Sequence, residues 1–397
     1  MQKEENKLFN AETCTQCGTC LNQCPFMLLP IEEAQNEISK MIETKSSEIV
    51  IEKCGNCLFC DIICPTQSNP SALTKEIQSK NYLKNGVENI RLMTEENPTN
   101  IMSLSLEVAN EELKKDVKLF SNPPNSKTLF FVGCSITYFY PDLVKSKLLE
   151  EFPVMGGLDY CCGAYAERYF GDIEGRIKGT ELFEKFKKLE VEKLITFCPG
   201  CERAISKVYP TLVDGYNIQN QNIINYLIEK YHEGELDIKN KINQRITFQD
   251  PCNWRERDKK IYEAPRELLE ILGCEVVEMK HNKEHSLCCG SPVRARDMSL
   301  GKKIGKKNIL EAKEIEADAI AFVCQGCLST LTLQASKKKI ETYYITELAQ
   351  MAIGEKIPHT QVESMEKIQN YIFKRILEDP NIMKQHGIVK NGKIIKI

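Results

Sequence analysis

Four short runs rich in β-branched and aromatic residues mark the C-terminal two thirds of the chain, and each ends close to a cysteine. These runs are Lys127–Val132, Lys193–Phe197, Arg245–Phe248 and Ala319–Val323. Helical stretches follow, among them "DLVKSKLLEEF" (142–152) and "APRELLEIL" (264–272). Strands that alternate with helices predict a parallel sheet. Because ligands of open α/β sheets bind beyond the carboxyl ends of the strands, we expect the cysteines to gather at sites of that kind.

The N-terminal third has a helical pattern instead. Apolar residues at mixed three- and four-residue spacing predict a helix over 31–42, and the pattern stays helical over 71–120. The segment "SNPPNSK" (121–127) is expected to be a linker, because consecutive prolines disfavour helix on either side. From "YYITELAQMAIGEKIPH" (343–359) onward the chain is amphipathic and charged, which predicts a packing helix followed by a terminal extension.

Charge and composition narrow the class of protein. The 53 basic and 56 acidic residues give a net charge of −3 without a basic run, so we do not expect a nucleic-acid partner. The start "MQKEENKLFN" lacks an apolar signal region, no stretch approaches 18 apolar residues, and the 19 cysteines are an odd number. We therefore expect a cytoplasmic protein, peripheral on the inner face of a membrane only through a partner subunit. In a reducing compartment, this many thiols indicates metal or redox chemistry.

Two cysteine runs share one spacing. The first run is "CTQCGTCLNQCP" and the second is "CGNCLFCDIICP", and their cysteines are Cys14, Cys17, Cys20 and Cys24, then Cys54, Cys57, Cys60 and Cys64. This is the spacing of bacterial ferredoxins, in which three thiolates of one run and the fourth of the other hold each 4Fe-4S cubane. That crossover would group Cys64 with the first three cysteines and Cys24 with Cys54, Cys57 and Cys60. Zinc sites and free thiols are the alternatives, but zinc sites use pairs of cysteine pairs rather than triplets.

A second cysteine pattern occurs twice after the linker, so the chain contains two copies of one module. The copies contribute Cys134, Cys161, Cys162, Cys198 and Cys201, then Cys252, Cys288, Cys289, Cys324 and Cys327. Five thiols exceed what a cubane or a zinc ion takes, and adjacent cysteines suit a wider metal assembly. Between the first two cysteines there are 26 residues in the first copy and 35 in the second, and the surplus is polar and loop-like. Cys274 belongs to neither pattern and is interpreted as a small buried hydrophobe.

These patterns predict an α+β, multi-domain fold. We expect an α-helical ferredoxin-like domain over 1–125, a first α/β module over 126–243, and a second α/β module with a C-terminal helical extension over 244–397.

The doubled C…CCG…C-x-x-C pattern resembles the CCG (cysteine-rich) domain of heterodisulfide reductases. Two ferredoxin runs followed by two such modules resemble the fused iron–sulfur polypeptide of that family, in which a ferredoxin-like part is joined to the catalytic part. The resemblance covers nearly the whole chain. It implies two cubane 4Fe-4S clusters held by the eight N-terminal cysteines and two noncubane 4Fe-4S clusters, each held by the five cysteines of one module. The clusters of the modules would face each other and cleave a substrate disulfide, so the ten module cysteines would be catalytic.

The resemblance implies an enzyme that reduces the mixed disulfide of coenzyme M and coenzyme B, with electrons entering through the cubanes. An iron–sulfur subunit of a glycolate, lactate or glycerol-phosphate dehydrogenase, which only relays electrons, is the alternative. A zinc-bearing scaffold is a third, weaker one. Since no flavin or nicotinamide fingerprint is present, we expect a protein electron donor: a membrane b-type cytochrome, a flavoprotein or a hydrogenase module.

A few further residues lie close to the CC pairs. Candidate proton donors are His281 and His285, and candidate anion-binding residues are Arg168, Arg294 and Arg296. Solvated loops and surface positions are the simpler interpretation of these residues. Trp254, the only tryptophan, lines the cleft or packs in the core, and the sequence does not distinguish the two.

Overall fold

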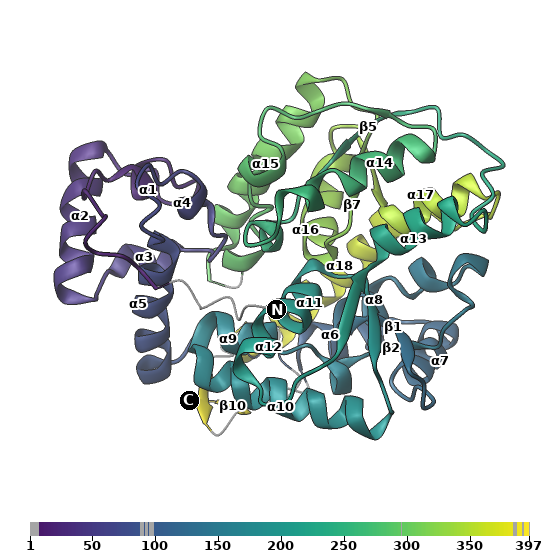
Figure 1. Cartoon of the computed structure of the whole chain (residues 1–397), viewed down its shortest axis with the longest axis horizontal. Helices are drawn as coiled ribbons and strands as arrows, with labels where there is room; N and C mark the ends of the chain where they lie inside the picture. Colours follow the sequence, from purple (N-terminus) through teal and green to yellow (C-terminus); the bar gives the residue numbers. More distant parts are fainter. Residues whose placement is uncertain are drawn as a thin grey trace.

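The computed structural model describes residues 8–87, 91, 94, 99–294, 296–383, 387–390 and 393–396. Figure 1 shows a small helical part, in purple, beside two larger α/β parts in teal and green. Helices and parallel sheets together confirm the α+β class. Most of the N-terminal stretch 1–10 lies outside the described residues, and the domain limits near 125 and 243 stay predictions.

The N-terminal part is made of short helices around the two cysteine runs. They are α1 (Thr19–Asn22), α2 (Ile31–Thr44), α3 (Glu48–Lys53), α4 (Phe59–Ile62) and α5 (Pro70–Asn85). The predicted helix over 31–42 is confirmed as α2, which buries Ala34, Ile38 and Met41 at the expected spacing. Helices α6 (Ile101–Glu107) and α7 (Glu111–Phe120) continue the helical region, and 88–90, 92–93 and 95–98 lie outside the described residues.

The first sheet is parallel throughout, in the order β2-β1-β3-β4. Its strands are β1 (Thr128–Val132), β2 (Val154–Gly156), β3 (Lys193–Thr196) and β4 (Gln219–Asn222). The helices of this part are α8 (Gly133–Phe139), α9 (Ala164–Phe170), α10 (Asp172–Lys188), α11 (Pro199–Arg203), α12 (Tyr209–Leu212) and α13 (Ile223–His232), with a π-helical turn over Ala204–Val208. The parallel sheet predicted from 127–132 and 193–197 is confirmed.

The second sheet repeats the first, in the order β6-β5-β7-β8 and again fully parallel. Its strands are β5 (Arg245–Phe248), β6 (Glu275–Val276), β7 (Ala319–Phe322) and β8 (Glu341–Tyr344), and its helices are α14 (Ala264–Ile271), α15 (Met298–Glu314), α16 (Gln325–Ser336) and α17 (Ile345–Ala352). In both sheets the chain starts at an inner strand, forms one edge strand, and then crosses to the other inner strand. The two modules are therefore structural repeats as well as sequence repeats.

Two segments differ from the sequence-based prediction. The stretch 142–152 was expected to be an α-helix, but it forms two short 3-10 helices. The reason is that the carbonyl and the N–H that would form one α-helical hydrogen bond here are both bonded to other parts of the chain. The Leu143 carbonyl accepts from the Thr346 hydroxyl, and the Lys147 N–H donates to Glu355. The tail was predicted as helical from Tyr343, but Tyr343 and Tyr344 end strand β8, and the helix begins at Ile345.

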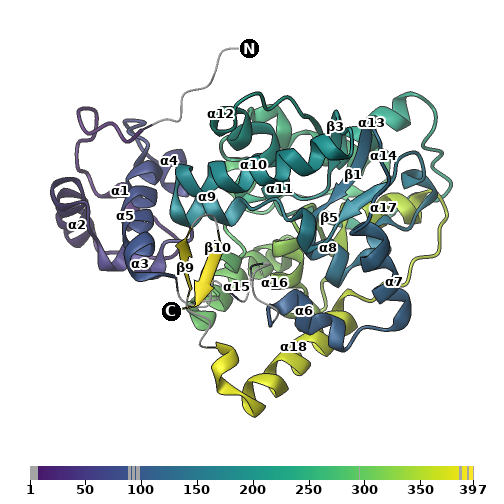
Figure 2. The ribbon, with the colours of Figure 1, turned by 90° about the horizontal axis from the view of Figure 1, so that it is seen from below.

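The C-terminal segment packs across the rest of the molecule. Helix α18 (Gln361–Glu378) lies against α6 and α16, and Figure 2 shows it along one side of the molecule. Strands β9 (Gly387–Lys390) and β10 (Lys393–Lys396) form an antiparallel pair next to α5. One hydrophobic core joins the modules, with Phe130 and Phe197 from the first and Phe248 and Phe322 from the second.

The remaining short helices are 3-10 turns: Pro141–Val144, Lys147–Leu149, Leu158–Tyr160, Cys252–Trp254, Lys259–Tyr262, Lys283–His285, Ser291–Val293 and Pro380–Met383. Among the helices that the structure describes, none is long and apolar enough to cross a membrane.

Candidate iron–sulfur site

The two N-terminal cysteine runs surround two neighbouring cavities. The thiol-bearing residues at the first cavity are Cys14, Cys17, Cys20 and Cys64, and those at the second are Cys20, Cys24, Cys54, Cys57 and Cys60. Each cavity thus combines three cysteines of one run with the fourth of the other, and Cys20 borders both. We call these the first and second thiol groups. The assignment of individual ligands stays a prediction.

Polar donors surround the thiols of these groups. The Ser68 N–H donates to Cys64 Sγ over 3.4 Å, and the Asn56 N–H donates to Cys54 Sγ over the same distance. The Thr19 hydroxyl lies 3.3 Å from Cys17 Sγ and is the main reason that the pKa of Cys17 is lowered. Burial raises the pKa of Cys20 to about 12. The loops thus supply donors that stabilise sulfur ligands once they are ionised.

In the modules, the sheet topology explains where the cysteines gather. Cys134 follows β1 and Cys198 follows β3, and these two strands are neighbours at the point where the strand order changes direction. Cys252 and Cys324 follow the equivalent strands β5 and β7. The carboxyl ends at such a switch point form the usual ligand site of open α/β sheets. The sequence-based prediction of this position is confirmed.

Within each module the five thiols form a continuous series of contacts. Cys134 Sγ and Cys161 Sγ are 3.8 Å apart. The further contacts in the first module join Cys161 with Cys162, Cys162 with Cys201, and Cys201 with Cys198. The matching contacts in the second module join Cys252 with Cys288, Cys288 with Cys289, Cys289 with Cys327, and Cys327 with Cys324. All ten predicted residues are thus brought together, five in each module.

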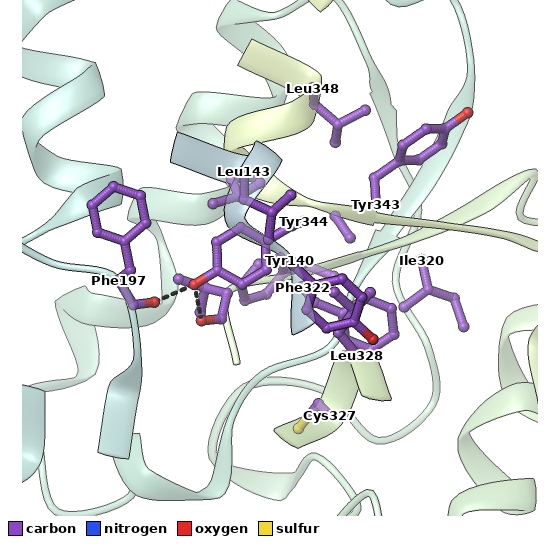
Figure 3. Packing of buried hydrophobic residues seen from close by; sticks show 14 of the residues in the cluster. Tyr140, Leu143, Phe197, Ile320, Phe322, Cys327, Leu328, Tyr343, Tyr344 and Leu348 are labelled. Carbon is purple, nitrogen blue, oxygen red and sulfur yellow. Dashed lines mark hydrogen bonds between the residues drawn. The ribbon is translucent and has the colours of Figure 1, made fainter. Parts of the chain in front are cut away.

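The two five-thiol groups meet between the modules. Cys198 of the first module and Cys324 of the second are in hydrogen-bonding contact. Tyr344 explains this approach: its hydroxyl donates to the carbonyl oxygens of Phe197 and Val323, the residues just before these two cysteines. Figure 3 shows the hydroxyl between its two acceptors. A side chain of the second module therefore fixes the spacing between the two strand ends.

The CCG turn of the second module needs its glycine. Gly290 has φ +87°, and a Cβ placed on it would lie 2.1 Å from the carbonyl oxygen of Gly301, so a side chain cannot fit. Gly301 lies in α15, so this close approach places the second CC pair next to that helix. The Asn308 amide also donates to the Cys288 carbonyl over 3.1 Å, while in the first module the Tyr209 hydroxyl donates to the Cys162 carbonyl.

Neighbouring thiols set one another's ionisation. Hydrogen bonds with Cys288 and Cys327 lower the pKa of Cys289 to about 6. Hydrogen bonds with Cys201 and Cys324 hold the pKa of Cys198 well below its ordinary value. In each series the same hydrogen bonds raise the pKa of a neighbouring thiol, Cys201 or Cys327, so the thiols ionise as a connected group. The thiolate is the form that binds metal.

The donor set fits iron–sulfur clusters. Thiolates are the soft ligands that iron–sulfur clusters require. The thiols of the N-terminal part lie around cavities, and those of the modules form extended series. In the part of the chain that the structure describes, no three Cys, His, Asp or Glu side chains are arranged to hold a single metal ion.

The other candidate residues have mostly structural contacts. His281 pairs with Glu311 at 2.5 Å, His285 is exposed, and the buried Trp254 donates to Glu202 of the first module over 2.9 Å. Cys274 is buried in the core, as predicted. The contacts of the three arginines differ: Arg168 donates to Asn253, Arg294 lies beside Met298, and Arg296 donates to Tyr82 and the Cys54 carbonyl.

Sequence reasoning missed two residues that organise the site. Tyr344 was placed in a predicted helix, and its spacing carried no chemical signal. Arg255 lies in the polar surplus of the second module and donates to the carbonyls of Cys57, Glu284 and Ser286. In the sequence, the longer loop of the second copy was the feature that could have pointed to Arg255.

Comparison with known proteins agrees with this description. The family model "Cysteine-rich domain" (CCG) matches residues 128–206 and 246–332, and the "4Fe-4S dicluster domain" matches residues 6–65. The D subunit of the dihydromethanophenazine:CoB–CoM heterodisulfide reductase of Methanosarcina mazei is 23% identical, over 88% of this chain and 95% of that protein. The B subunit of the fumarate reductase (CoM/CoB) of Methanothermobacter marburgensis is 26% identical, over 86% and 72%. The probable iron–sulfur-binding oxidoreductase FadF of Bacillus subtilis is 24% identical, over 86% and 46%.

The matched domains occur in the order that the sequence predicted, one dicluster domain before two cysteine-rich domains. The chain is therefore an iron–sulfur oxidoreductase related to the D subunit of heterodisulfide reductase.

Proposed function

We propose that the protein reduces, reversibly, the mixed disulfide of two small thiols, coenzyme M and coenzyme B, as the name of its relative in Methanosarcina mazei suggests. The observation that carries the proposal is the contact between Cys198 and Cys324, which joins two complete five-thiol groups across the modules. Cleavage of a disulfide leaves two sulfur atoms, and two facing sites provide one binding site for each sulfur atom. The reaction adds two electrons and two protons, breaks the S–S bond and forms two S–H bonds.

The cysteines would divide the work between the domains. When bound, iron–sulfur clusters supply one-electron transfer and iron atoms that bind sulfur. The ten module cysteines would hold two noncubane 4Fe-4S clusters, and the eight N-terminal cysteines would hold two cubanes. The hydroxyl of Tyr344 keeps the strand ends at Cys198 and Cys324 at a fixed separation. In this proposal, Tyr344 thus holds the two substrate sites at a fixed spacing before electrons arrive.

A partner protein would supply the electrons. The relative in Methanosarcina mazei is by name one part of a heterodisulfide reductase complex, and this chain carries no flavin or nicotinamide fingerprint. A membrane b-type cytochrome, a flavoprotein and a hydrogenase module are the classes of donor that fit. The complex would then work in the cytoplasm, held at the membrane only through such a partner.

The alternative is an iron–sulfur subunit that passes electrons between a flavin subunit and a quinone, without a substrate of its own. The similarity to FadF, named as an iron–sulfur-binding oxidoreductase, keeps this alternative open. Both five-thiol groups are complete in this chain, which favours disulfide chemistry, since a relay needs no paired substrate sites.

An anaerobic assay on the purified chain separates the two. With a reduced dye as donor, we expect turnover of the heterodisulfide and none of glycolate, lactate or glycerol phosphate. The preparation should hold about sixteen iron atoms, four per cluster. An iron-loaded chain that leaves the heterodisulfide unchanged would establish the relay instead, and an iron content near eight would show that the modules hold no clusters.

A further inference from the structure

The second thiol group is docked against the modules through three arginines. Arg255 donates to the Cys57 carbonyl, and Arg296 donates to the Cys54 carbonyl over 2.7 Å. The Asn56 side chain, between these cysteines, donates to the backbone carbonyl of Arg168 over 3.4 Å. The guanidinium groups of Arg255 and Arg296, both in the second module, bind this N-terminal loop directly. The guanidinium of Arg168, from the first module, lies within electrostatic reach of Cys57.

These arginines have no carboxylate partner within the described residues. Arg255 is satisfied by backbone carbonyls and by the Phe59 ring, whose centroid lies 5.2 Å away. The side-chain partner of Arg168 is the Asn253 amide oxygen at 2.6 Å. Arg296 bonds to the Tyr82 hydroxyl at 3.1 Å, and its buried Nε has no hydrogen-bond partner in the described part of the chain. Three positive charges therefore lie near the second thiol group, and no acid is bonded to them. One acid, Asp61, lies beside the group and is bonded to Ser71; after burial, its charge contributes to the raised pKa of Cys60.

The first thiol group has different neighbours. Its sulfur atoms contact the hydroxyls of Thr19 and Thr66 and the N–H of Ser68. These partners are neutral. By contrast, burial raises the pKa of Cys57, and Arg255 and Arg168 counteract that rise. The two groups therefore have similar thiols in unlike electrostatic surroundings.

We propose that Arg168, Arg255 and Arg296 raise the reduction potential at the second thiol group above that at the first. This inference rests on the proposed clusters. A cluster gains one negative charge when it accepts an electron, and nearby uncompensated cations stabilise that charge, more strongly where water is excluded. Electrons from the donor protein thus move downhill from the first group to the second.

The second group is also the one beside the modules. Cys57 lies within electrostatic reach of Cys252 and Cys288 of the second module. The raised potential therefore lies at the thiol group next to the proposed substrate site, and it opposes the return of electrons to the first group.

A potentiometric titration followed by electron paramagnetic resonance tests this on the iron-loaded, complete chain. The wild-type protein should show two cubane potentials that differ. Arg255→Gln and Arg296→Gln should each lower the higher potential by a tenfold or larger change in the reduction equilibrium, about 59 mV for one electron, and leave the lower one unchanged. Arg255→Lys, which keeps the charge, should restore most of the shift. The matched control is Arg375→Gln, an arginine on α18 that pairs with Glu107.

Two results would overturn the inference: equal cubane potentials in the wild type, or potentials that the arginine variants leave unchanged. If Arg255→Gln or Arg296→Gln fails to fold, Arg168→Gln serves, because it removes a single side-chain contact. The dye-linked assay reports separately on the proposed function. If the protein turns over the heterodisulfide but its two cubane potentials are equal, only the arginine inference is refuted. If the two potentials differ but the heterodisulfide is not turned over, only the disulfide reductase proposal is refuted.

Discussion

The two modules share a fold and a thiol pattern but differ in how their CC pairs are supported. In the first, Glu167 follows the CCG turn and is neutralised by Arg203 and Lys75. In the second, the equivalent position, four residues after the CCG glycine, is Arg294, which has no acidic partner among the described residues. The two modules are thus alike in sheet order and sulfur positions but differ in the charges around them.

The difference in charge around the two CC pairs matches the way in which the N-terminal domain contacts each module. Its helix α5 contacts the first module through Lys75, and its second cysteine run contacts the second module through Arg255. Arg255 belongs to the loop surplus that makes the second copy longer. A loop extension in one copy thus gives two equivalent sites different neighbours. The five-thiol group of the second module lies next to the second cysteine run, so we expect electrons from the N-terminal domain to reach that module first.

Removing one thiol from each module tests whether the two sites act together. We expect Cys162→Ala and Cys289→Ala each to abolish heterodisulfide reduction with a dye donor, because each removes one of the two sulfur-binding sites. Each variant should lose iron from its own module only, as measured by iron analysis and electron paramagnetic resonance. Cys274→Ala, a buried cysteine outside the thiol series, should keep full activity. Activity that survives in Cys162→Ala would mean that the second module works alone.

The salt bridge at Glu167 tests the support of the first CC pair. Burial acts to raise the pKa of Glu167, but Arg203 and Lys75 lower it to about 2. This shift from 4.5 is equivalent to about 3 kcal/mol of stability at neutral pH. We expect Glu167→Gln to lose about that amount in anaerobic urea unfolding.

The sign of the shift fixes the pH dependence. A lowered carboxyl pKa stabilises the fold above the unfolded-state value of 4.5, and the contribution falls only as pH drops below it. The difference between wild type and Glu167→Gln should therefore stay constant from pH 8 to pH 5. Glu192→Gln, which breaks an exposed pair with Lys127, is the control with little expected effect. A difference that changes within this range would refute the assignment.

Local patterns predicted the two-module fold well, because strands rich in β-branched residues and cysteine spacings are local signals. The edge strand β4 was missed, since it reads "QNQN" and does not alternate in hydrophobicity. Cysteine spacing also identified the thiols of the candidate site. Contacts between distant segments, such as Tyr344 with Phe197, leave no pattern in the sequence.

Tyr344 tests whether the spacing between the modules is fixed by one side chain. Tyr344→Phe leaves the buried carbonyls of Phe197 and Val323 without this donor, which should cost about 2 kcal/mol in unfolding free energy. It should also lower heterodisulfide turnover while all the iron is retained. Tyr262→Phe is the matched control, since the buried Tyr262 hydroxyl has no hydrogen-bond partner in the described part of the chain. Equal losses in the two variants would show that Tyr344 acts only through its ring.

The smallest expected effect concerns a segment that the second module alone has, the connection from α17 to α18. His359 lies there, with its ring nitrogens 3.5 Å from Glu347 Oε1 and 3.2 Å from Glu341 Oε2. Its pKa is raised, first by the hydrogen bond with Glu347 and further by the charge of Glu341, although partial burial acts in the opposite direction. A raised histidine pKa adds stability below the unfolded-state value of 6.5, and that stability is lost as pH rises through the folded-state pKa.

Because the ring is partly exposed, solvent screens the pair, and the effect should be below about 1 kcal/mol. We therefore expect the wild type to lose this small increment of unfolding free energy between pH 6.5 and pH 8, while His359→Gln shows no such loss. His232→Gln, which breaks an exposed pair with Glu267, controls for general histidine titration. The same slope in wild type and His359→Gln would mean that the connection is held by other contacts, such as the bond from Gln361 to Glu347.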